Sequence, residues 1–332
     1  MNGMDNEQWR KFMDAAIGVP PGQLTVAAVR RRLVRRRVTR VAEVAGVVVV
    51  VLAIAGATAA VRVFGAAPGP AGRPAAPETV YVAYTSPRGQ SLKFTFVPIS
   101  NATHKAGKPF RLRCSCEVAA TPNGKTLYVA TDSSIVPVST ATNKPGNPIK
   151  IRGGAGEIAI GPDGKTAYAD TGILGNTVTP INLATNKPGK PIHIDDPGEI
   201  AFSPDGKTAY VLGAAGHSST VTPINTATSK PGKPIQIPGG AEEIAITPNG
   251  KTAYVAANDG SYGLVTPIST ATNKAGQPIR VLSAEELVIT PDGKTLYAAS
   301  GDKVTPVNTA TNKPGQPIVT NDGTAWGIVI AP

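Results

Sequence analysis

Short runs that alternate large apolar with small or polar residues recur along most of the chain. In one representative unit the runs cover residues 243–247, 252–256, 264–268 and 277–281. A period of two residues is typical of half-buried strands, and the valine, isoleucine and threonine content favours them too. Proline, glycine, asparagine and aspartate separate the runs, as they do in tight turns. Each unit therefore predicts four antiparallel strands.

The unit is repeated with little change. The turn Pro-(Asp/Asn)-Gly-Lys returns every 40 to 44 residues, with its glycine at Gly124, Gly164, Gly206, Gly250 and Gly293. A tyrosine follows each turn, and an Ala-Thr-Asn-Lys segment or a near variant ends at Lys105, Lys144, Lys187, Lys230, Lys274 and Lys313. A period in the forties with several strands per repeat is typical of β-propeller blades.

The two ends of the array predict how the ring closes. The first unit begins at 79–83, which aligns with a second strand, and the last residues, 327–332, align with a first strand. We therefore predict an all-β fold over residues 78–332, a six-bladed β-propeller of four-stranded antiparallel blades, closed by a C-terminal inner strand. Every third strand contains a proline, such as Pro267, and a proline within a strand predicts a bulge there.

Residues 1–62 have a different character. An apolar run at 41–62 contains 18 consecutive uncharged residues, 44–61, which as a helix would extend about 27 Å and so predict a transmembrane helix. Seven arginines precede it within residues 30–40, which predicts a cytoplasmic N-terminal segment at 1–40 and a propeller outside the cell, anchored by a single membrane pass. A cleaved signal peptide is the alternative, although its basic region would be unusually long. The proline- and glycine-rich residues 63–77 predict an extended spacer.

The net charge of +11 does not indicate nucleic-acid binding. Residues 1–43 hold nine basic and four acidic side chains, and membrane topology accounts for that excess. The rest of the chain spreads 24 basic and 18 acidic side chains over a large surface, without a nucleic-acid-binding motif. The membrane is thus an expected partner and nucleic acid is not.

The segment at 247–256, Thr-Pro-Asn-Gly-Lys-Thr-Ala-Tyr-Val-Ala, with Ala-Thr-Asn-Lys at 271–274, resembles the YVTN-type repeat of YncE-like bacterial β-propellers. The resemblance covers residues 78–332. It implies an extracytoplasmic propeller that in most members has no established catalysis. Members of that family usually have seven blades and no proline in the third strand, so no binding residue is transferred from them.

A carboxylate begins the first strand in five units, and these five residues form the first candidate site. Because first strands surround the channel of a propeller, the glutamates are expected to ring one of its mouths. Clustered oxygen ligands suit a cation such as Ca²⁺. The alternatives are a structural role, with the same inter-blade hydrogen bond or lysine pair in every blade, and a contact with a substrate. The residues are Glu117, Glu157, Glu199, Glu243 and Glu286.

Two further candidates lie near the same mouth. Cys114 and Cys116 are the only cysteines. In an oxidising compartment a local disulfide is expected if the loop bends enough, and free thiols or a metal site are the alternatives. Trp326 precedes the last predicted strand, where it could stack on a ligand or fill the space left by the missing sixth glutamate.

The sequence predicts a binding function more readily than a catalytic one. It contains no Ser-His-Asp order, zinc-binding His-Glu-x-x-His segment or phosphate loop, and no cofactor other than Ca²⁺ is expected. A membrane-tethered scaffold for a protein or cell-envelope ligand is the first hypothesis. A metal-dependent enzyme of the lactonase or lyase kind is the alternative, and signalling through residues 1–40 is a third.

Overall fold

The structure is a computed structural model of the chain. It describes residues 47–52, 61–64, 79–85, 93–100, 106–113, 117–131, 133–151, 154–171, 176–215, 218–301 and 303–319.

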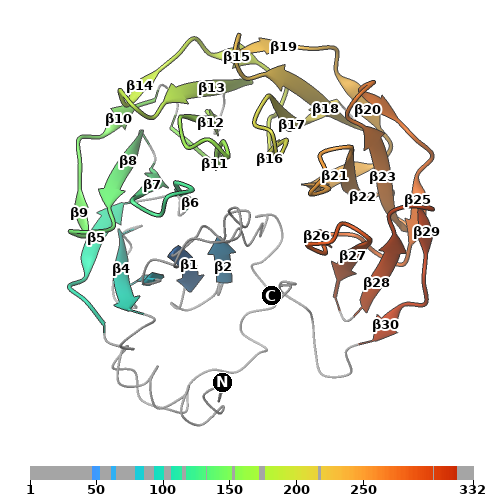
Figure 1. The fold of residues 1–332 in the computed structure, drawn as a ribbon, viewed down its shortest axis with the longest axis horizontal. Helices are drawn as coiled ribbons and strands as arrows, with labels where there is room; N and C mark the ends of the chain where they lie inside the picture. The colour runs from blue at the N-terminus through green and yellow to red at the C-terminus, as the bar shows by residue number, and fades with distance from the viewer. Residues whose placement is uncertain are drawn as a thin grey trace.

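The described strands form six sheets that follow one another around a ring (Figure 1). The first sheet, in the order β2-β1-β3-β4-β5, consists of β1 (Val47–Leu52), β2 (Val61–Phe64), β3 (Thr79–Thr85), β4 (Lys93–Ser100) and β5 (Phe110–Arg113). The second consists of β6 (Val118–Ala120), β7 (Thr126–Ala130), β8 (Ser134–Ser139), β9 (Lys144–Pro145) and β10 (Ile149–Lys150). The third consists of β11 (Ile158–Ile160), β12 (Thr166–Asp170), β13 (Thr177–Asn182), β14 (Lys187–Pro188) and β15 (Ile192–His193).

The remaining three sheets repeat the third one strand for strand. The fourth consists of β16 (Ile200–Phe202), β17 (Thr208–Ala215), β18 (Ser218–Asn225), β19 (Lys230–Pro231) and β20 (Ile235–Ile237). The fifth consists of β21 (Gly240–Ile246), β22 (Thr252–Asn258), β23 (Gly263–Ser269), β24 (Lys274–Ala275) and β25 (Ile279–Val281). The sixth consists of β26 (Glu286–Ile289), β27 (Thr295–Ser300), β28 (Lys303–Asn308), β29 (Lys313–Pro314) and β30 (Ile318–Val319). This arrangement confirms the predicted all-β propeller of repeated antiparallel sheets.

Antiparallel pairing gives the ring two unlike faces. From the second sheet onward, the first strand, the second strand and the third strand of each sheet pair antiparallel in sequence order. The turn between the first and second strands and the turn after the third strand therefore lie on one side, which we call the turn face. The connections between the second and third strands, and the starts of the first strands, lie on the other side, which we call the loop face.

The predicted bulge in the third strand is wrong. In the fifth sheet Pro267 stands opposite Tyr254, and the pairing of β22 with β23 runs without a break from Thr252 to Asn258. The irregularity lies in the outer strand, which is split into β24 and β25. The carbonyl of Pro267 accepts a hydrogen bond of 2.7 Å from the N–H of Gly276 at this break. In a strand the nitrogen and the carbonyl of one residue point to the same side, so the nitrogen of Pro267 also points toward the break between β24 and β25. The N–H that proline lacks would therefore have had no partner there, and the hydrogen bonds between β22 and β23 are complete.

The first sheet differs from the others. β1 pairs parallel with β3, so that Val47–Val51 lie along Thr79–Ala83, the edge for which the sequence predicts residues 327–332. Those C-terminal residues lie outside the described part of the chain. Both segments are short, apolar and β-branched, and either suits a sheet edge.

β1 also lies within residues 41–62, where the sequence predicts a transmembrane helix, and β2 begins at the end of that range. A valine-rich segment favours a strand when a neighbouring strand can pair with it. It favours a helix where the segment must form all its backbone hydrogen bonds within itself, as in a bilayer. Within the described residues, no helix has the length and apolar character needed to cross a membrane.

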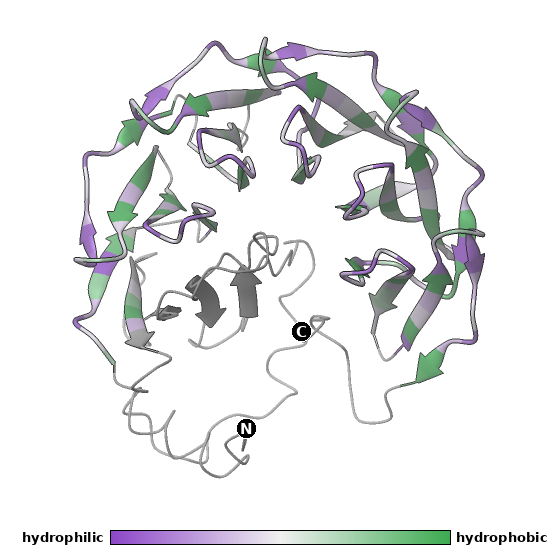
Figure 2. Ribbon diagram, viewed as in Figure 1, coloured by the Kyte–Doolittle hydropathy of each residue, from purple (hydrophilic) through white to green (hydrophobic). Residues whose placement is uncertain are grey.

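The core lies between neighbouring sheets. One buried cluster joins Tyr210, Leu212 and Val221 of the fourth sheet to Ile244 and Val255 of the fifth. Each buried side chain of this size stabilises the fold by roughly 1.5–3 kcal/mol relative to exposure. Figure 2 shows hydrophobic residues along the middle strands and hydrophilic residues in the turns. Each sheet is therefore a two-sided layer that depends on both neighbours.

Candidate functional site

Four of the five glutamates lie at or just before the start of the first strands β6, β11, β16 and β26, on the loop face, and Glu243 lies within β21. Glu117, Glu199 and Glu243 are buried, whereas Glu157 and Glu286 are half-buried. A buried carboxylate needs hydrogen bonds or charge compensation from its surroundings.

Glu243 shows what one of these carboxylates does. Its Oε2 accepts a hydrogen bond of 2.8 Å from the backbone N–H of Leu287, in the first strand of the next sheet. A shift of register between β21 and β22, at Ala241 and Glu243, immediately precedes it, and such bulges re-aim a side chain. This contact is the inter-blade hydrogen bond that was the alternative to a cation site.

The third sheet adds a carboxylate that the sequence analysis missed. Asp170 is buried at the end of β12, and its Oδ1 accepts hydrogen bonds of 2.7 Å from the N–H groups of both Gly156 and Glu157. The sequence holds one signal for it, because the matching positions of the other units are Ala130, Leu212, Ala256 and Ala299. Asp170 fixes the entrance of β11 through the backbone.

Within the described ranges, no group of three or more His, Cys, Asp or Glu side chains is arranged to hold a metal ion. Because Glu243 bonds to the next sheet, we expect millimolar Ca²⁺ to leave the Tm of the full chain in EDTA unchanged. We expect Glu199→Ala combined with Glu243→Ala to lower that Tm in either buffer.

A specifically bound ion must stabilise the native state by mass action. A Ca²⁺-dependent rise in Tm of several degrees that disappears in the double variant would therefore establish the cation ring. It would also revive the metal-dependent enzyme hypothesis.

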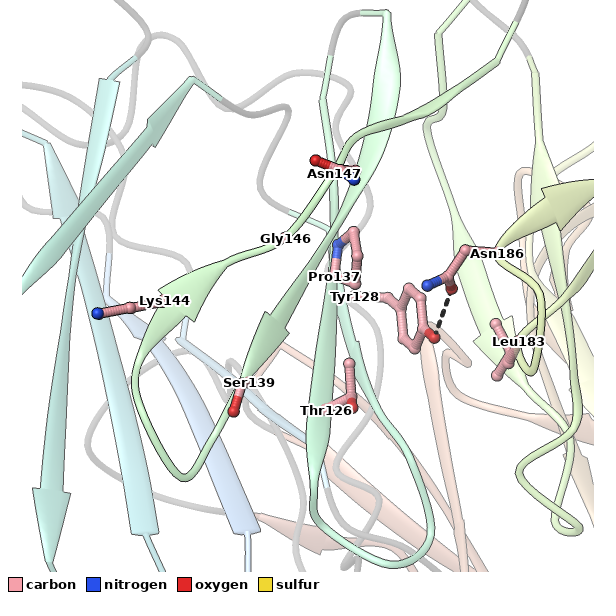
Figure 3. A pocket seen from close by; sticks show the side chains of 9 residues that line it. All are labelled: Thr126, Tyr128, Pro137, Ser139, Lys144, Gly146, Asn147, Leu183 and Asn186. Carbon is pink, nitrogen blue, oxygen red and sulfur yellow. Dashed lines mark hydrogen bonds between the residues drawn. The ribbon is translucent and has the colours of Figure 1, made fainter.

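The recurring tyrosine and the Ala-Thr-Asn-Lys segment prove to be partners across the sheets. The hydroxyl of Tyr128 donates to Oδ1 of Asn186 in the next sheet at 2.9 Å, and Figure 3 shows the two side chains facing each other. Tyr210 makes the same bond to Asn273, at 3.1 Å, and Tyr254 to Asn312, at 2.7 Å. These asparagines adopt a left-handed conformation with φ of 52–55°, which asparagine tolerates well.

The third sheet departs from this pattern. Its tyrosine, Tyr168, meets Ser229 rather than an asparagine, and their hydroxyl oxygens are 3.4 Å apart. Ser229 nevertheless keeps the left-handed φ, at 52°. Burial raises the pKa of Tyr128, Tyr168, Tyr210 and Tyr254 above the ordinary value of a phenol. The repeated tyrosine therefore has a structural role between sheets.

A shallow pocket of about 370 Å³ opens beside one of these pairs (Figure 3). Tyr128, Pro137 and Lys144 of the second sheet and Leu183 and Asn186 of the third line it. Leu183 replaces a threonine that elsewhere bonds to the first turn, as Thr226 does to the carbonyl of Gly206 at 2.7 Å. The pocket holds no charged group besides the exposed lysine among its lining residues, and it offers no catalytic arrangement.

A more suitable recognition feature is the loop at 259–262 on the loop face. Oδ1 of Asp259 accepts hydrogen bonds of 2.8 Å from the N–H groups of Ser261 and Tyr262. The Tyr262 N–H bond, followed by that of Ser261, lowers the pKa of Asp259. The loop presents Tyr262, half-exposed at 50%, with the guanidinium of Arg280 at 5.5 Å from the ring centre. Leu282, 49% exposed, follows β25 nearby in sequence.

The other predicted site residues lie outside the described part of the chain. They are Cys114, Cys116 and Trp326. The disulfide and the stacking role remain predictions.

Comparison with known proteins shows the fold. No protein-family model matches the chain, and no curated protein matches it. Among solved structures it is similar to Kuenenia stuttgartiensis hydrazine synthase, with 20% identity and a TM-score of 0.56, over 81% of this chain and 78% of that one. It is also similar to the Cps50 (Swd1) β-propeller domain of Myceliophteria thermophila, with 10% identity and a TM-score of 0.53, over 68% of this chain and 80% of that one.

A third similar structure is the dihydro-heme d1 dehydrogenase NirN in complex with DHE. The identity is 14% and the TM-score 0.58, over 69% of this chain and 52% of that one. At these identities the likeness establishes a β-propeller and no more, since propellers host many unrelated functions.

Proposed function

We propose that this protein is a membrane-tethered, extracytoplasmic β-propeller whose loop face binds a protein or cell-envelope ligand. The observation that carries the proposal is the contrast between the two faces. Every first turn repeats the same Pro-(Asp/Asn)-Gly-Lys form, whereas the loops between second and third strands differ in length and sequence. A rigid ring that varies on one face alone is suited to recognition by loops.

Tyr262 and Arg280 form the part of this face best suited to bind a partner. Tyrosine and arginine are enriched among the residues that dominate binding energies at interfaces. Asp259 holds the loop in one conformation, which reduces the entropy lost on binding. Leu282 adds exposed apolar surface.

A photo-crosslinking amino acid at position 262, in the full chain in its native cells, tests this proposal. We expect a discrete covalent adduct with an envelope component. The same amino acid at Thr272, in a turn on the opposite face, should give no adduct with a protein or a wall polymer. Adducts of equal yield from both positions, or from neither, would contradict recognition by the loop face.

The finer architecture belongs to the same proposal. We propose six blades, a transmembrane helix at 41–62 and closure by the strand at 327–332 on the edge of β3. In a bilayer the backbone of a valine-rich run must be satisfied internally, which favours a helix. If residues 41–62 lie in the bilayer, β1 no longer pairs with β3, and the edge of β3 is free to pair with residues 327–332.

The sixth sheet supports closure. Ile318 is 52% exposed, whereas its counterparts Ile149, Ile192, Ile235 and Ile279 are buried. Tyr297 is likewise only half-buried, unlike the tyrosines of the four preceding sheets. A neighbouring blade would cover both.

One experiment tests anchor and closure together, in a Cys114→Ser, Cys116→Ser background. Full chain carrying Val82→Cys and Ile328→Cys, which the predicted pairing places opposite each other as Val129 and Val118 are in the second sheet, should resist alkaline extraction from lipid vesicles and form a disulfide between the introduced cysteines. Extraction into the soluble fraction would contradict the anchor. Failure of the disulfide to form would contradict closure.

A further inference from the structure

The two faces of the ring carry opposite charge. On the turn face, each of the five first turns contains one exposed lysine, and each of the five second turns ends on another. The ten residues are Lys125, Lys144, Lys165, Lys187, Lys207, Lys230, Lys251, Lys274, Lys294 and Lys313. The acidic residues in these described turns are Asp163, Asp205 and Asp292.

The loop face has the reverse balance. Eleven described carboxylates lie at its strand ends and loops, namely Glu117, Glu157, Asp170, Asp195, Asp196, Glu199, Glu242, Glu243, Asp259, Glu285 and Glu286. The described basic residues at the same strand ends are Lys93, Arg113, Lys150, Arg280 and Lys303. The ring is thus polarised along its axis.

The lysines of the turn face are weakly compensated. Lys207 lies 3.6 Å from Asp205 and Lys294 lies 3.7 Å from Asp292, and all four side chains are more than half exposed. Exposed pairs of this kind contribute little. The three aspartates serve their own turns, since Oδ1 of Asp205 accepts from the hydroxyl of Ser203 at 2.7 Å and from the N–H of Lys207 at 3.1 Å. The hydroxyl of Ser203 is the main cause of the lowered pKa of Asp205.

The chain enters the propeller on this same face. Thr79, the first residue of β3, is paired with Ser100, the last residue of β4. In the second sheet the equivalent pair, Thr126 and Ser139, joins the two lysine-bearing turns. Residues 65–77 of the spacer at 63–77 would extend about 40 Å as a polyproline-type chain. A membrane segment that precedes this spacer therefore keeps the turn face close to the bilayer.

The composition of the face favours lipid headgroups over nucleic acid. Its repeated turns contain no aromatic side chain and no arginine. Proteins that bind single-stranded nucleic acid stack bases on aromatic rings, and arginine is preferred for bidentate contacts with phosphate. Lysines held in repeated turns across one side of a ring match an extended anionic plane, where each adds electrostatic attraction.

We propose that the turn face docks on anionic phospholipid headgroups, which leaves the loop face directed away from the membrane. This inference rests on the proposed membrane attachment for the nearness of the bilayer, and on the described lysines for the contact itself. It specifies the orientation in which the loop face meets its ligand.

Hydrogen exchange of the full chain in vesicles tests the proposal. We expect amides in the first turns to exchange severalfold more slowly in phosphatidylglycerol vesicles than in phosphatidylcholine vesicles. The protection should disappear at high salt, because exposed charges are then screened over a few ångströms. It should also disappear in a variant with glutamine at Lys125, Lys165, Lys207, Lys251 and Lys294.

The matched control carries glutamine at Lys108, Lys150, Lys190, Lys233 and Lys303. This control variant also loses five positive charges, but at positions outside the turns. Its first-turn amides should therefore remain protected from exchange in phosphatidylglycerol vesicles. Equal exchange in the two lipids by a chain that resists alkaline extraction would overturn the docking and leave the anchor intact. Protection by phosphatidylglycerol in a chain that is extracted would support docking without the anchor. Equal or stronger protection by a single-stranded oligonucleotide would overturn the assignment to lipid.

Discussion

Replacement of Gly263 by alanine is expected to lower the free energy of unfolding by about 3 kcal/mol, at the upper end of the costs of overpacking. A Cβ at this position would lie 2.4 Å from the carbonyl carbon of Ser283 and 2.5 Å from the nitrogen of Ala284. Both are backbone atoms of the connection that follows β25, so no side-chain rotation relieves the overlap. Urea unfolding of the full chain measures the loss.

Gly240→Ala is the control for this change. It makes the same substitution at the start of β21, where the added Cβ would approach no atom closer than the carbonyl oxygen of Asn258, at 3.9 Å. We expect a small effect there. Similar decreases in the free energy of unfolding for Gly263→Ala and Gly240→Ala would contradict the prediction, because they would show that the nearby backbone is not the cause of the destabilisation at Gly263.

The second large effect is expected from the tyrosines that bridge the sheets. Tyr254 donates to Oδ1 of Asn312 at 2.7 Å and lies 3.1 Å from the carbonyl oxygen of Thr309. Tyr254→Phe removes this donor from a buried site and should cost about 1–2 kcal/mol. Tyr168→Phe should cost less, because its partner Ser229 is 3.4 Å away. The two free energies of unfolding, measured side by side, check this order, and a reversed order would contradict it.

Conversely, Ser229→Asn should raise the stability by a few tenths of a kcal/mol up to about 1 kcal/mol. Asparagine tolerates the left-handed backbone better than serine and places an acceptor nearer the hydroxyl of Tyr168. The gain should vanish in a Tyr168→Phe background, since the new acceptor then has no donor.

The same tyrosines should make the fold sensitive to alkali. Their pKa values are raised in the folded state, so the unfolded chain loses its phenolic protons first as the pH rises. The stability they provide is present below a pH of about 10 and is lost as the pH rises through the folded pKa values. The stability difference between wild type and Tyr254→Phe should therefore shrink above that pH.

Much of the fold could be predicted from the sequence because its information is local and repeated. The predicted second strand at 252–256 corresponds to β22 (Thr252–Asn258), and the third at 264–268 to β23 (Gly263–Ser269). Turn residues and alternating side chains determine these elements within a few positions. The predicted fourth strand at 277–281 corresponds to β25 (Ile279–Val281), and the prediction did not include β24 (Lys274–Ala275), a second short piece that pairs with the same third strand.

The contacts between repeats could not be predicted in this way. Tyr254 and Asn312 are 58 positions apart. The tyrosine and the asparagine recur in most units for a reason that is visible only when the sheets are packed. The role of Glu243 was one of two alternatives until its partner, Leu287, was located on the next sheet. Asp170 was missed because it occurs in a single repeat, where repetition gives no signal.

The split outer strands also affect how the molecules behave at high concentration. The outer edge of a sheet is where another chain can add a strand and begin an aggregate. In the fifth sheet this edge consists of two short pieces, β24 and β25, interrupted between Ala275 and Ile279 by a glycine and a proline. Such an edge offers an incoming strand no continuous row of donors and acceptors. The repeated proline of the third strand lies beside this break in the outer strand. The break therefore helps to prevent edge-to-edge association and to keep the protein monodisperse.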